Sequence, residues 1–327
     1  MIVVNNKCSA EHNTKKINKL LTQRRKVELP EGDIYISGPL KLKLNGNWLT
    51  GNGPGTRLIL NELSNPSNFI HVTSDRCKVT DLMIIGNREY VNYNPAKLRG
   101  CGIVVYKAYR TYIENVFVHD VSMDGIHSRG SNDLKASLTT ISNCVIERAG
   151  KHSIYHNKYS QDRIIFNTFT QDAKSDGLML DGNYGSVITN SHFYRNDDNN
   201  VKIIGGGRHR FENCTLDKAQ NWGVYLAYTD DITMSKCIIF DNNQGERDAG
   251  GVCFAENVYR CLLMQNTIYD DPPVTQNYGI FIRNSCTNNN IVFNEVRNSI
   301  NENYKVENDL NLILYGNGNV LKQVNKD

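Results

Sequence analysis

The sequence repeats itself with a period of about 23–30 residues, a length that is typical of repeat architectures. Apolar segments that end in asparagine, or once in lysine, recur along the chain, as in YIEN, TISN and IIFN. The repeated positions are Asn115, Asn143, Asn167, Asn190, Asn213, Lys236, Asn266 and Asn294. A second series keeps the same period, a glycine or small residue followed by an alternating apolar strand, as in CGIVV, DGLML and YGIFI. Two series with one period predict a stack of similar coils.

Each period leaves room for two or three short strands, in which apolar and polar residues alternate. No amphipathic stretch of helical length lies between the strands, so a βαβ arrangement is excluded. Parallel coils stack at about 4.8 Å, which places one turn asparagine above the next, with its amide bonding along the stack. The residues directly after the asparagines are predicted to stack inward, and they are Cys144, Thr168, Ser191, Cys214, Cys237 and Thr267.

Cysteine usage and charge narrow the class of protein. The nine cysteines form no Cys-x-x-Cys pair, which favours free buried thiols over a disulfide framework or a structural zinc site. The formal net charge of +3 does not indicate a nucleic-acid partner. No apolar run reaches the length of a membrane-spanning helix, and the N-terminal residues do not have the pattern of a secretory signal.

The N-terminal part of the chain carries further motifs. Ile17, Leu20 and Leu21 give a predicted helix one apolar stripe, LPEGDIYIS follows at 29–37, and LTGNGPGTRLIL follows at 49–60. Together with the repeat, these segments resemble the right-handed parallel β-helix superfamily of pectate lyases and phage tailspike depolymerases, over about residues 10–320. The acidic stretch that often precedes the helix in that family is absent.

The resemblance implies an all-β fold, a single-stranded right-handed parallel β-helix with coils of about 23–30 residues. This solenoid is expected at 31–327, after an N-terminal segment with a capping helix at 1–30, and the chain is expected to form one domain overall.

The resemblance also implies carbohydrate chemistry on the outer face of the strands that begin at the glycines. On these strands the residue before the glycine, and the residues two and four after it, should face outward, whereas Ser128 and His156 should face inward. Ionisable residues at the outward positions concentrate between Asp124 and Lys202. The predicted catalytic residues are Asp124, His127, His152, Tyr155, Asp176 and Lys202, and the predicted substrate-binding residues are Arg129, Asp181, Asp198, Trp222 and Tyr225.

One reaction that these residues allow is glycoside hydrolysis. Asp124 and Asp176 lie two coils apart in the predicted stack, hence roughly 9–10 Å, near the wide end of the carboxylate spacing in inverting glycosidases. Asp181 and Asp198 are alternative partners for this pair. An aspartate before a glycine also commonly does no more than cap a turn.

The rival reaction is β-elimination or C5-epimerisation of a uronic acid, which needs a base, a proton donor and a cation for the carboxylate. His127, Tyr155 and Lys202 supply these residue types, with Arg129 as a further cation and His152 as an alternative base. The catalytic pattern of polygalacturonases and the Asp-Pro-His-Glu signature of alginate epimerases are both absent. No residue role is therefore carried over from either family.

Two further features each have a functional and a structural interpretation. Trp222, Tyr225 and Tyr278 can form platforms for sugar rings or pack against the side of the coils. Aspartate pairs at 197–198, 230–231 and 270–271 are compatible with calcium, but they lie in turns beside asparagine, where aspartate usually bonds the backbone. The prediction is therefore no metal and no cofactor.

The function predicted from the sequence is a polysaccharide lyase or glycoside hydrolase that acts on an acidic or surface glycan. A uronate C5-epimerase and a non-catalytic, glycan-binding tail fibre protein are the alternatives. The absence of a signal and the resemblance to tailspikes predict a phage virion protein or a leaderless secreted protein. Polysaccharide is the expected partner, with neither nucleic acid nor membrane, and a homotrimer is the assembly that the tailspike resemblance implies.

Overall fold

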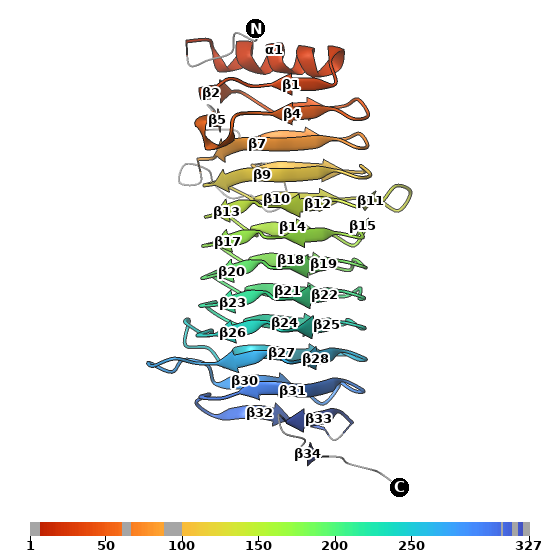
Figure 1. The fold of residues 1–327 in the computed structure, drawn as a ribbon, viewed down its shortest axis with the longest axis vertical. Coiled ribbons are helices and arrows are strands. Elements are labelled where there is room, and N and C mark those ends of the chain that lie inside the picture. Colours follow the sequence, from red (N-terminus) through yellow and green to blue (C-terminus); the bar gives the residue numbers. More distant parts are fainter. Residues whose placement is uncertain (1–6, 61–66, 88–99, 309, 316–319, 323–327) are drawn as a thin grey trace. The chain divides into compact units, whose positions relative to one another are not determined.

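The computed structural model describes residues 7–60, 67–87, 100–308, 310–315 and 320–322. The chain divides into two compact units, Met1–Lys174 (unit 1) and Ser175–Asp327 (unit 2). Each unit is a stack of coils built from short parallel strands, which confirms the predicted all-β parallel solenoid (Figure 1). The single domain expected after residue 30 stays a prediction. No helix among the described residues is both long and apolar enough to cross a membrane.

Unit 1 begins with the helix α1 (Ala10–Gln23) and continues as strands. The strands are β1 (Lys26–Glu28), β2 (Gly32–Ile36), β3 (Leu40–Leu42), β4 (Trp48–Thr50), β5 (Thr56–Leu60), β6 (Ile70–Val72), β7 (Lys78–Ile85), β8 (Ile103–Tyr106), β9 (Tyr112–His119), β10 (Ile126–Arg129), β11 (Ala136–Ser137), β12 (Thr140–Ser142), β13 (Val145–Glu147), β14 (Ile154–His156), β15 (Ser160–Gln161), β16 (Ile164–Phe166) and β17 (Phe169–Gln171), with a 3₁₀ turn at Gly53–Gly55. One parallel sheet runs β3–β6–β8–β10–β14. The other strands pair in the same manner, for example β7 with β9 and β9 with β12 and β13.

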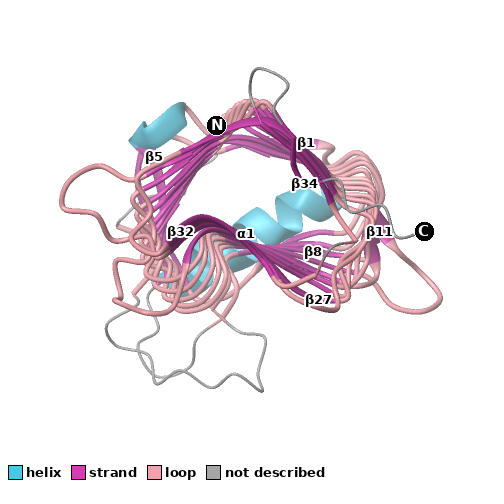
Figure 2. Cartoon of the chain, turned by 90° about the horizontal axis from the view of Figure 1, so that it is seen from below, coloured by secondary structure: helices cyan, strands magenta, loops and turns pink. Residues whose placement is uncertain are grey.

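The predicted capping helix is present and closes one end of unit 1. Ser9 caps α1 by accepting a hydrogen bond from the backbone N–H of His12, 3.2 Å away. Ile17 and Leu21 are fully buried against the first coils, so the predicted apolar stripe of the helix faces the core. Figure 2 shows α1 lying across the opening that the strands of unit 1 surround. The helix therefore shields the apolar interior of the first coil from water.

Among its described residues, unit 2 contains strands but no helix. They are β18 (Leu178–Asp181), β19 (Val187–Thr189), β20 (His192–Tyr194), β21 (Val201–Ile204), β22 (Arg210–Glu212), β23 (Thr215–Asp217), β24 (Val224–Ala227), β25 (Thr233–Ser235), β26 (Ile238–Phe240), β27 (Gly250–Glu256), β28 (Leu262–Met264), β29 (Thr267–Tyr269), β30 (Tyr278–Ile282), β31 (Asn290–Val296), β32 (Glu302–Val306), β33 (Leu312–Tyr315) and β34 (Val320–Lys322). The sheet of glycine-led strands runs β18–β21–β24–β27–β30–β32 with parallel pairing throughout. Only the last pair, β33 and β34, is antiparallel among the described strands.

The turn asparagines adopt the predicted sharp turn through a left-handed backbone. Asn143, Asn167, Asn190 and Asn213 have φ between 46° and 53°, a region that asparagine tolerates better than most residues. In unit 1 the amide of Asn167 donates to Oδ1 of Asn143 at 2.8 Å, as the ladder predicts. The stacked turns therefore combine a favourable local conformation with hydrogen bonds along the stack.

In two later coils, the turn residue lies one position earlier in the chain than the sequence predicts. There the left-handed residues are Gln265 and Phe293, with φ of 55° in both. Asn266 and Asn294 occupy the next, inward position, are buried, and bond to each other at 2.9 Å. Asn266, and not Thr267, therefore continues the inward stack, because its amide oxygen also accepts the backbone N–H of Cys237 at 2.9 Å.

Candidate active site

The glycine-led strands of unit 1 have the register that the sequence predicts. His127 of β10 pairs with Val104 of β8 on one side and with Tyr155 of β14 on the other. Ser128 and His156, which were expected to face inward, are both fully buried. Arg129 lies at the exposed end of β10. His127 and Tyr155 are therefore neighbours on the outer face of one parallel sheet.

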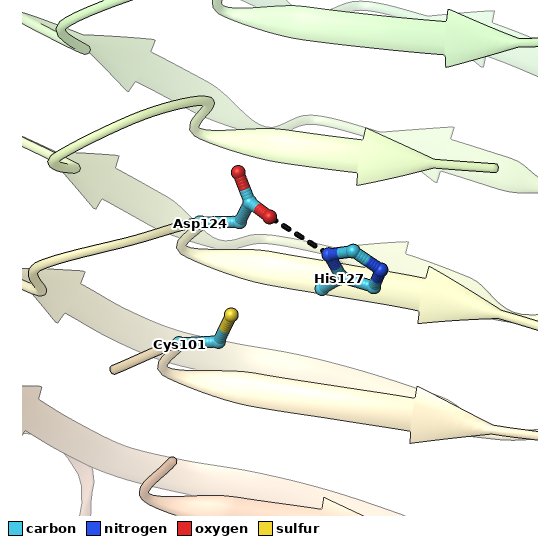
Figure 3. A group of neighbouring side chains, drawn as sticks. All are labelled: Cys101, Asp124 and His127. Atoms are coloured by element: carbon cyan, nitrogen blue, oxygen red, sulfur yellow. Dashed lines mark hydrogen bonds and ion pairs between the residues drawn. The ribbon is translucent and has the colours of Figure 1, made fainter. Parts of the chain in front are cut away.

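Asp124 joins His127 at the turn that leads into β10. Its carboxylate oxygen Oδ2 lies 2.7 Å from His127 Nδ1, and its Oδ1 accepts the backbone N–H of His152 at 3.1 Å. Gly125 allows the backbone to pass close to the neighbouring coil, because a Cβ at that position would lie 2.3 Å from Cγ2 of Ile146. Figure 3 shows the Asp124 carboxylate pointing toward the His127 ring. The two side chains thus form a buried carboxylate–imidazole pair.

The protonation of this pair follows from its surroundings. Burial alone would raise the pKa of Asp124, but the hydrogen bond from His127 and the positive charges of His152, His127 and Lys151 outweigh it and lower that pKa. An ionised Asp124 accepts the hydrogen on Nδ1 of His127. Whenever the ring is neutral, its lone pair then lies on Nε2. That nitrogen is the atom that can accept a proton.

The environment of His127 is enclosed on several sides. The residue is 2% exposed, and its Nε2 has no hydrogen-bond partner in the described structure. The Tyr155 ring stands edge-on to the His127 ring, with centroids 4.7 Å apart, and the His152 ring lies 5.3 Å from the Tyr155 ring. Lys151 places its Nζ 5.5 Å from the centre of the Tyr155 ring. A base, a phenol and a cation therefore gather around one point of unit 1.

Cys101 adds a third potential metal ligand to the pair. It lies in the turn before β8, on the coil next to Asp124 (Figure 3). One ligand atom each of Cys101, Asp124 and His127 lie within 4.8 Å of one another, and all three residues are buried. Burial, and then the charge of Asp124, raise the pKa of the Cys101 thiol well above its usual range. The thiol is therefore neutral at physiological pH unless a cation replaces its proton.

Unit 2 holds a second polar group on its own glycine-led strands. Asp176 is buried and its Oδ1 accepts both the backbone N–H and the side-chain amide of Asn199, at 3.2 and 2.8 Å. Asp198 forms ion pairs with Lys202 at 3.2 Å and with Arg247 at 3.5 Å. Burial would lower the pKa of Lys202, but the charges of Asp176 and Asp198 outweigh it and raise that pKa. This group therefore presents a firmly protonated ammonium.

The aromatic residues predicted as sugar platforms differ in exposure. Trp222 is only 4% exposed and stacks on Tyr278, with centroids 6.4 Å apart and an angle of 13° between the rings. It belongs to an apolar cluster of unit 2, which agrees with the packing alternative, and its role in substrate binding stays a prediction. Tyr225 is only half-buried, and Lys202 Nζ lies 5.6 Å from its ring centre. Tyr225 therefore keeps part of its ring exposed, whereas Trp222 does not.

Several other aspartates named in the sequence analysis lie in unit 2. Asp181 ends β18 and is half-buried. Asp230 and Asp231 both pair with Arg260. Asp270 accepts the backbone N–H groups of residues 275 and 276, which is ordinary turn bonding.

Asp270 is nevertheless unusual among these carboxyl groups. It is fully buried, and burial, with the neighbouring Asp241, raises its pKa to about 6. Its backbone donors oppose this shift without cancelling it. Asp270 is therefore a carboxyl group that changes charge close to neutral pH.

Two residues of the unit 1 group were missed from the sequence. Cys101 was assigned only to an outward row, without a role, and Lys151 was not assigned at all. Lys151 directly precedes His152, so its position one residue before an outward site was the available signal. Asp124 belongs to unit 1 and Asp176 to unit 2, and their proposed action as a pair stays a prediction.

Comparison with known proteins relates the chain to several proteins of this fold. A family model described as "Right handed beta helix region" matches residues 68–197 and 124–317. A comparison with curated proteins finds no match. The chain is similar to the A-module of the mannuronan C-5 epimerase AlgE6 of Azotobacter vinelandii, with 16% identity, a TM-score of 0.70 and 94% of each chain covered.

Two further solved structures show the same likeness. The first is the enzymatically active domain of tailspike protein 2 of bacteriophage CBA120, with 12% identity and a TM-score of 0.68 over 89% of this chain and 48% of that chain. The second is the catalytic domain of a GH87 alpha-1,3-glucanase, with 15% identity and a TM-score of 0.61 over 90% of this chain and 67% of that chain. At these identities the similarity concerns the fold.

Proposed function

The chain belongs to the right-handed β-helix family, and from this starting point we propose that it is a polysaccharide-processing enzyme that removes the C5 proton of a uronic acid residue. Loss of that proton leads either to β-elimination or to C5-epimerisation. The single observation that carries the proposal is the buried Asp124–His127 hydrogen bond, which leaves His127 Nε2 as an unpartnered proton acceptor. The mannuronan C-5 epimerase and tailspike neighbours support a carbohydrate substrate.

Each residue of the unit 1 group has a role in this reaction. His127 Nε2 is enclosed in this structure and takes the C5 proton once the side chains that cover it move aside, while Asp124 stabilises the imidazolium that forms. The electrons left at C5 delocalise into the uronate carboxylate, where a cation such as Lys151 stabilises the additional charge. Tyr155 donates a proton, to the oxygen leaving from C4 in elimination or to the opposite face of C5 in epimerisation. The two reactions thus share one base and differ in where the phenol hydrogen goes.

Hydrolysis finds less support in the described residues. A glycosidase needs one carboxyl group that is protonated when the other is ionised. Asp124 accepts two hydrogen bonds from N–H groups, and Asp176 and Asp198 also lie among N–H donors and cations. The surroundings of Asp124 lower its pKa, so this carboxyl group is not arranged as a general acid.

Unit 2 and the wider setting complete the proposal. Lys202 and Tyr225 offer an ammonium beside an aromatic face, which suits the carboxylate and the ring of another uronate residue of the chain. A virion protein that processes surface glycan agrees with the tailspike neighbours, and a leaderless secreted enzyme is the alternative. The homotrimer stays a prediction.

The test is turnover of the full chain on polymannuronate, polyguluronate and polygalacturonate in deuterated water. Ultraviolet absorbance of an unsaturated uronate detects elimination, and deuterium at C5 detects epimerisation. Either signal should disappear in His127→Ala. New reducing ends with neither signal would show hydrolysis and would refute proton abstraction at C5. Binding of these polymers without any product would favour the glycan-binding fibre protein.

A further inference from the structure

We propose that Cys101, Asp124 and His127 form a binding site for a zinc ion, and that the bound ion disables the His127 base. The metal site stands on the three ligand residues alone. The loss of activity rests on the proposed function, in which His127 Nε2 must carry a lone pair. The site differs from the aspartate pairs in turns, which are compatible with calcium but were not predicted to bind it.

The geometry is close to that of a three-ligand zinc site. Zinc bonds of about 2.0–2.3 Å at tetrahedral angles place the ligand atoms about 3.3–3.6 Å apart. The three ligand atoms here lie within 4.8 Å of one another, and the shortest separation is the 2.7 Å between Asp124 Oδ2 and His127 Nδ1. Zinc would therefore open the hydrogen-bonded pair by less than about 1 Å and draw the Cys101 sulfur inward. Side-chain rotation suffices for changes of this size.

Charge and ligand chemistry select the ion. A thiolate and a carboxylate together neutralise a divalent cation, so the filled site would bury no net charge. Sulfur and imidazole ligands suit zinc, whereas calcium and magnesium require more oxygen ligands than the group supplies. The thiol proton leaves to solvent when the ion binds, which overcomes the raised pKa of Cys101.

Neighbouring groups that are not ligands hold Asp124 and Cys101 in position. The backbone N–H of His152 holds Asp124 Oδ1 at 3.1 Å, which leaves Oδ2 to face the ion. Cys101 packs with Val104 and Met123, so the sulfur side of the site is apolar. Such neighbouring contacts orient metal ligands and strengthen binding.

His127 links the zinc site to the proposed reaction. The ring is buried and has one unpartnered nitrogen, Nε2. When zinc occupies Nδ1, the ring hydrogen moves to Nε2. The ring can then no longer accept a proton at that atom. The three residues therefore act as either a base or a metal site, but not as both at once.

The experiment is a cobalt(II) titration of the full chain, because cobalt replaces zinc and a bound thiolate gives a charge-transfer band. We expect one ion per chain with this band. Cys101→Ser, or Cys101→Ala if the serine variant does not fold, should abolish the band and weaken zinc binding in equilibrium dialysis by at least about tenfold. Cys144→Ser is the matched control, because Cys144 is a buried thiol of unit 1 that donates to the carbonyl oxygens of Ile113 and Ser142.

The outcomes separate the two proposals. Absence of the band, or a band that persists in Cys101→Ser, overturns the zinc site. Where the wild type turns over a polyuronate, zinc should inhibit it, and Cys101→Ser should need at least about tenfold more zinc for the same fractional inhibition of its own activity. Zinc binding in a protein with no turnover would support the site and contradict the proposed function. Turnover without zinc binding would support the proposed function and contradict the zinc site.

Discussion

Replacement of Asp124 by asparagine changes one atom of the side chain that orients the proposed base, His127, and keeps the shape of that side chain. The new side chain can still accept the backbone N–H of His152, which lies 3.1 Å from Oδ1. Its amide nitrogen, however, now faces His127 Nδ1 at the former 2.7 Å contact. An amide nitrogen donates a hydrogen, so Nδ1 must accept it, and the ring hydrogen moves to Nε2. The variant therefore holds His127 in the form that cannot accept a proton.

The expected loss follows from the role of a general base. Such a group contributes about 10²–10⁴ in rate, which equals about 2.7–5.4 kcal/mol of transition-state stabilisation. The stability cost should be smaller, about 1–2 kcal/mol, because a charge-assisted hydrogen bond is replaced by a neutral one. The pKa of Asp124 is lowered in the folded protein. Ionised Asp124 therefore stabilises the fold at pH values above the ordinary pKa of aspartate, and this stabilisation is lost as the pH falls. The stability of Asp124→Asn should not show this decrease at low pH.

The assay compares initial rates and urea unfolding of the full-length wild type and variant. Asp120→Asn is the matched control, since Asp120 forms the same kind of pair with His119 Nδ1 at 2.8 Å, at the end of β9. This control should keep its activity. If Asp124→Asn folds and retains more than about a tenth of the wild-type rate, or if Asp120→Asn loses as much, His127 is not the base.

Three further predictions concern other described residues. Tyr155→Phe keeps the ring contact with His127 but removes the phenol, so turnover should fall by about 10²–10³ with an unchanged unfolding midpoint, and retention of the rate would assign proton donation to another group. Asn167→Ala should lower the free energy of unfolding by about 1–2 kcal/mol in urea, because the φ of 46° strains alanine and a hydrogen bond is lost. Asn167→Gly loses the same hydrogen bond without the strain, so it should be the more stable of the two variants. The opposite order would contradict this explanation. Asp270, with a pKa raised to about 6, stabilises the fold most below about pH 4 and progressively less up to pH 6. Asp270→Asn cannot ionise, so urea unfolding at a series of pH values should show no such decline, and the same decline in the variant would assign it elsewhere.

The coil architecture was predictable because its cause is local. The regular period, the alternating strands and the asparagines at the turns are each visible along the chain, and the β8–β10–β14 register follows from them. The slip at Asn266 was not predictable, because glutamine or phenylalanine can take the left-handed turn when the next residue supplies the buried amide.

Side-chain contacts between coils were harder to predict. Alternation places Trp222 outward, but burial depends on whether Tyr278, two strands further along the same sheet, covers it. The same holds for Cys101, whose sulfur lies close to Asp124 although the two residues belong to different coils. A pattern within one strand contains no information about its neighbour on the next coil. The outward rows could be derived, but the partners within each row had to be observed.

The glycines at the start of several strands in the glycine-led sheets have a consequence for how the sequence of such a protein can evolve. A Cβ at Gly125, Gly223 or Gly279 would meet a neighbouring side chain at 2.3, 2.6 or 2.2 Å, so the backbone path is held in one course there. The residue just ahead of the glycine has no such backbone restriction, although its side chain packs against its neighbours, and it is aspartate in one coil, tryptophan in another and tyrosine in a third. Mutation can therefore exchange the chemistry presented by one coil while the scaffold stays the same. A new specificity can arise there by single substitutions, without rebuilding the fold.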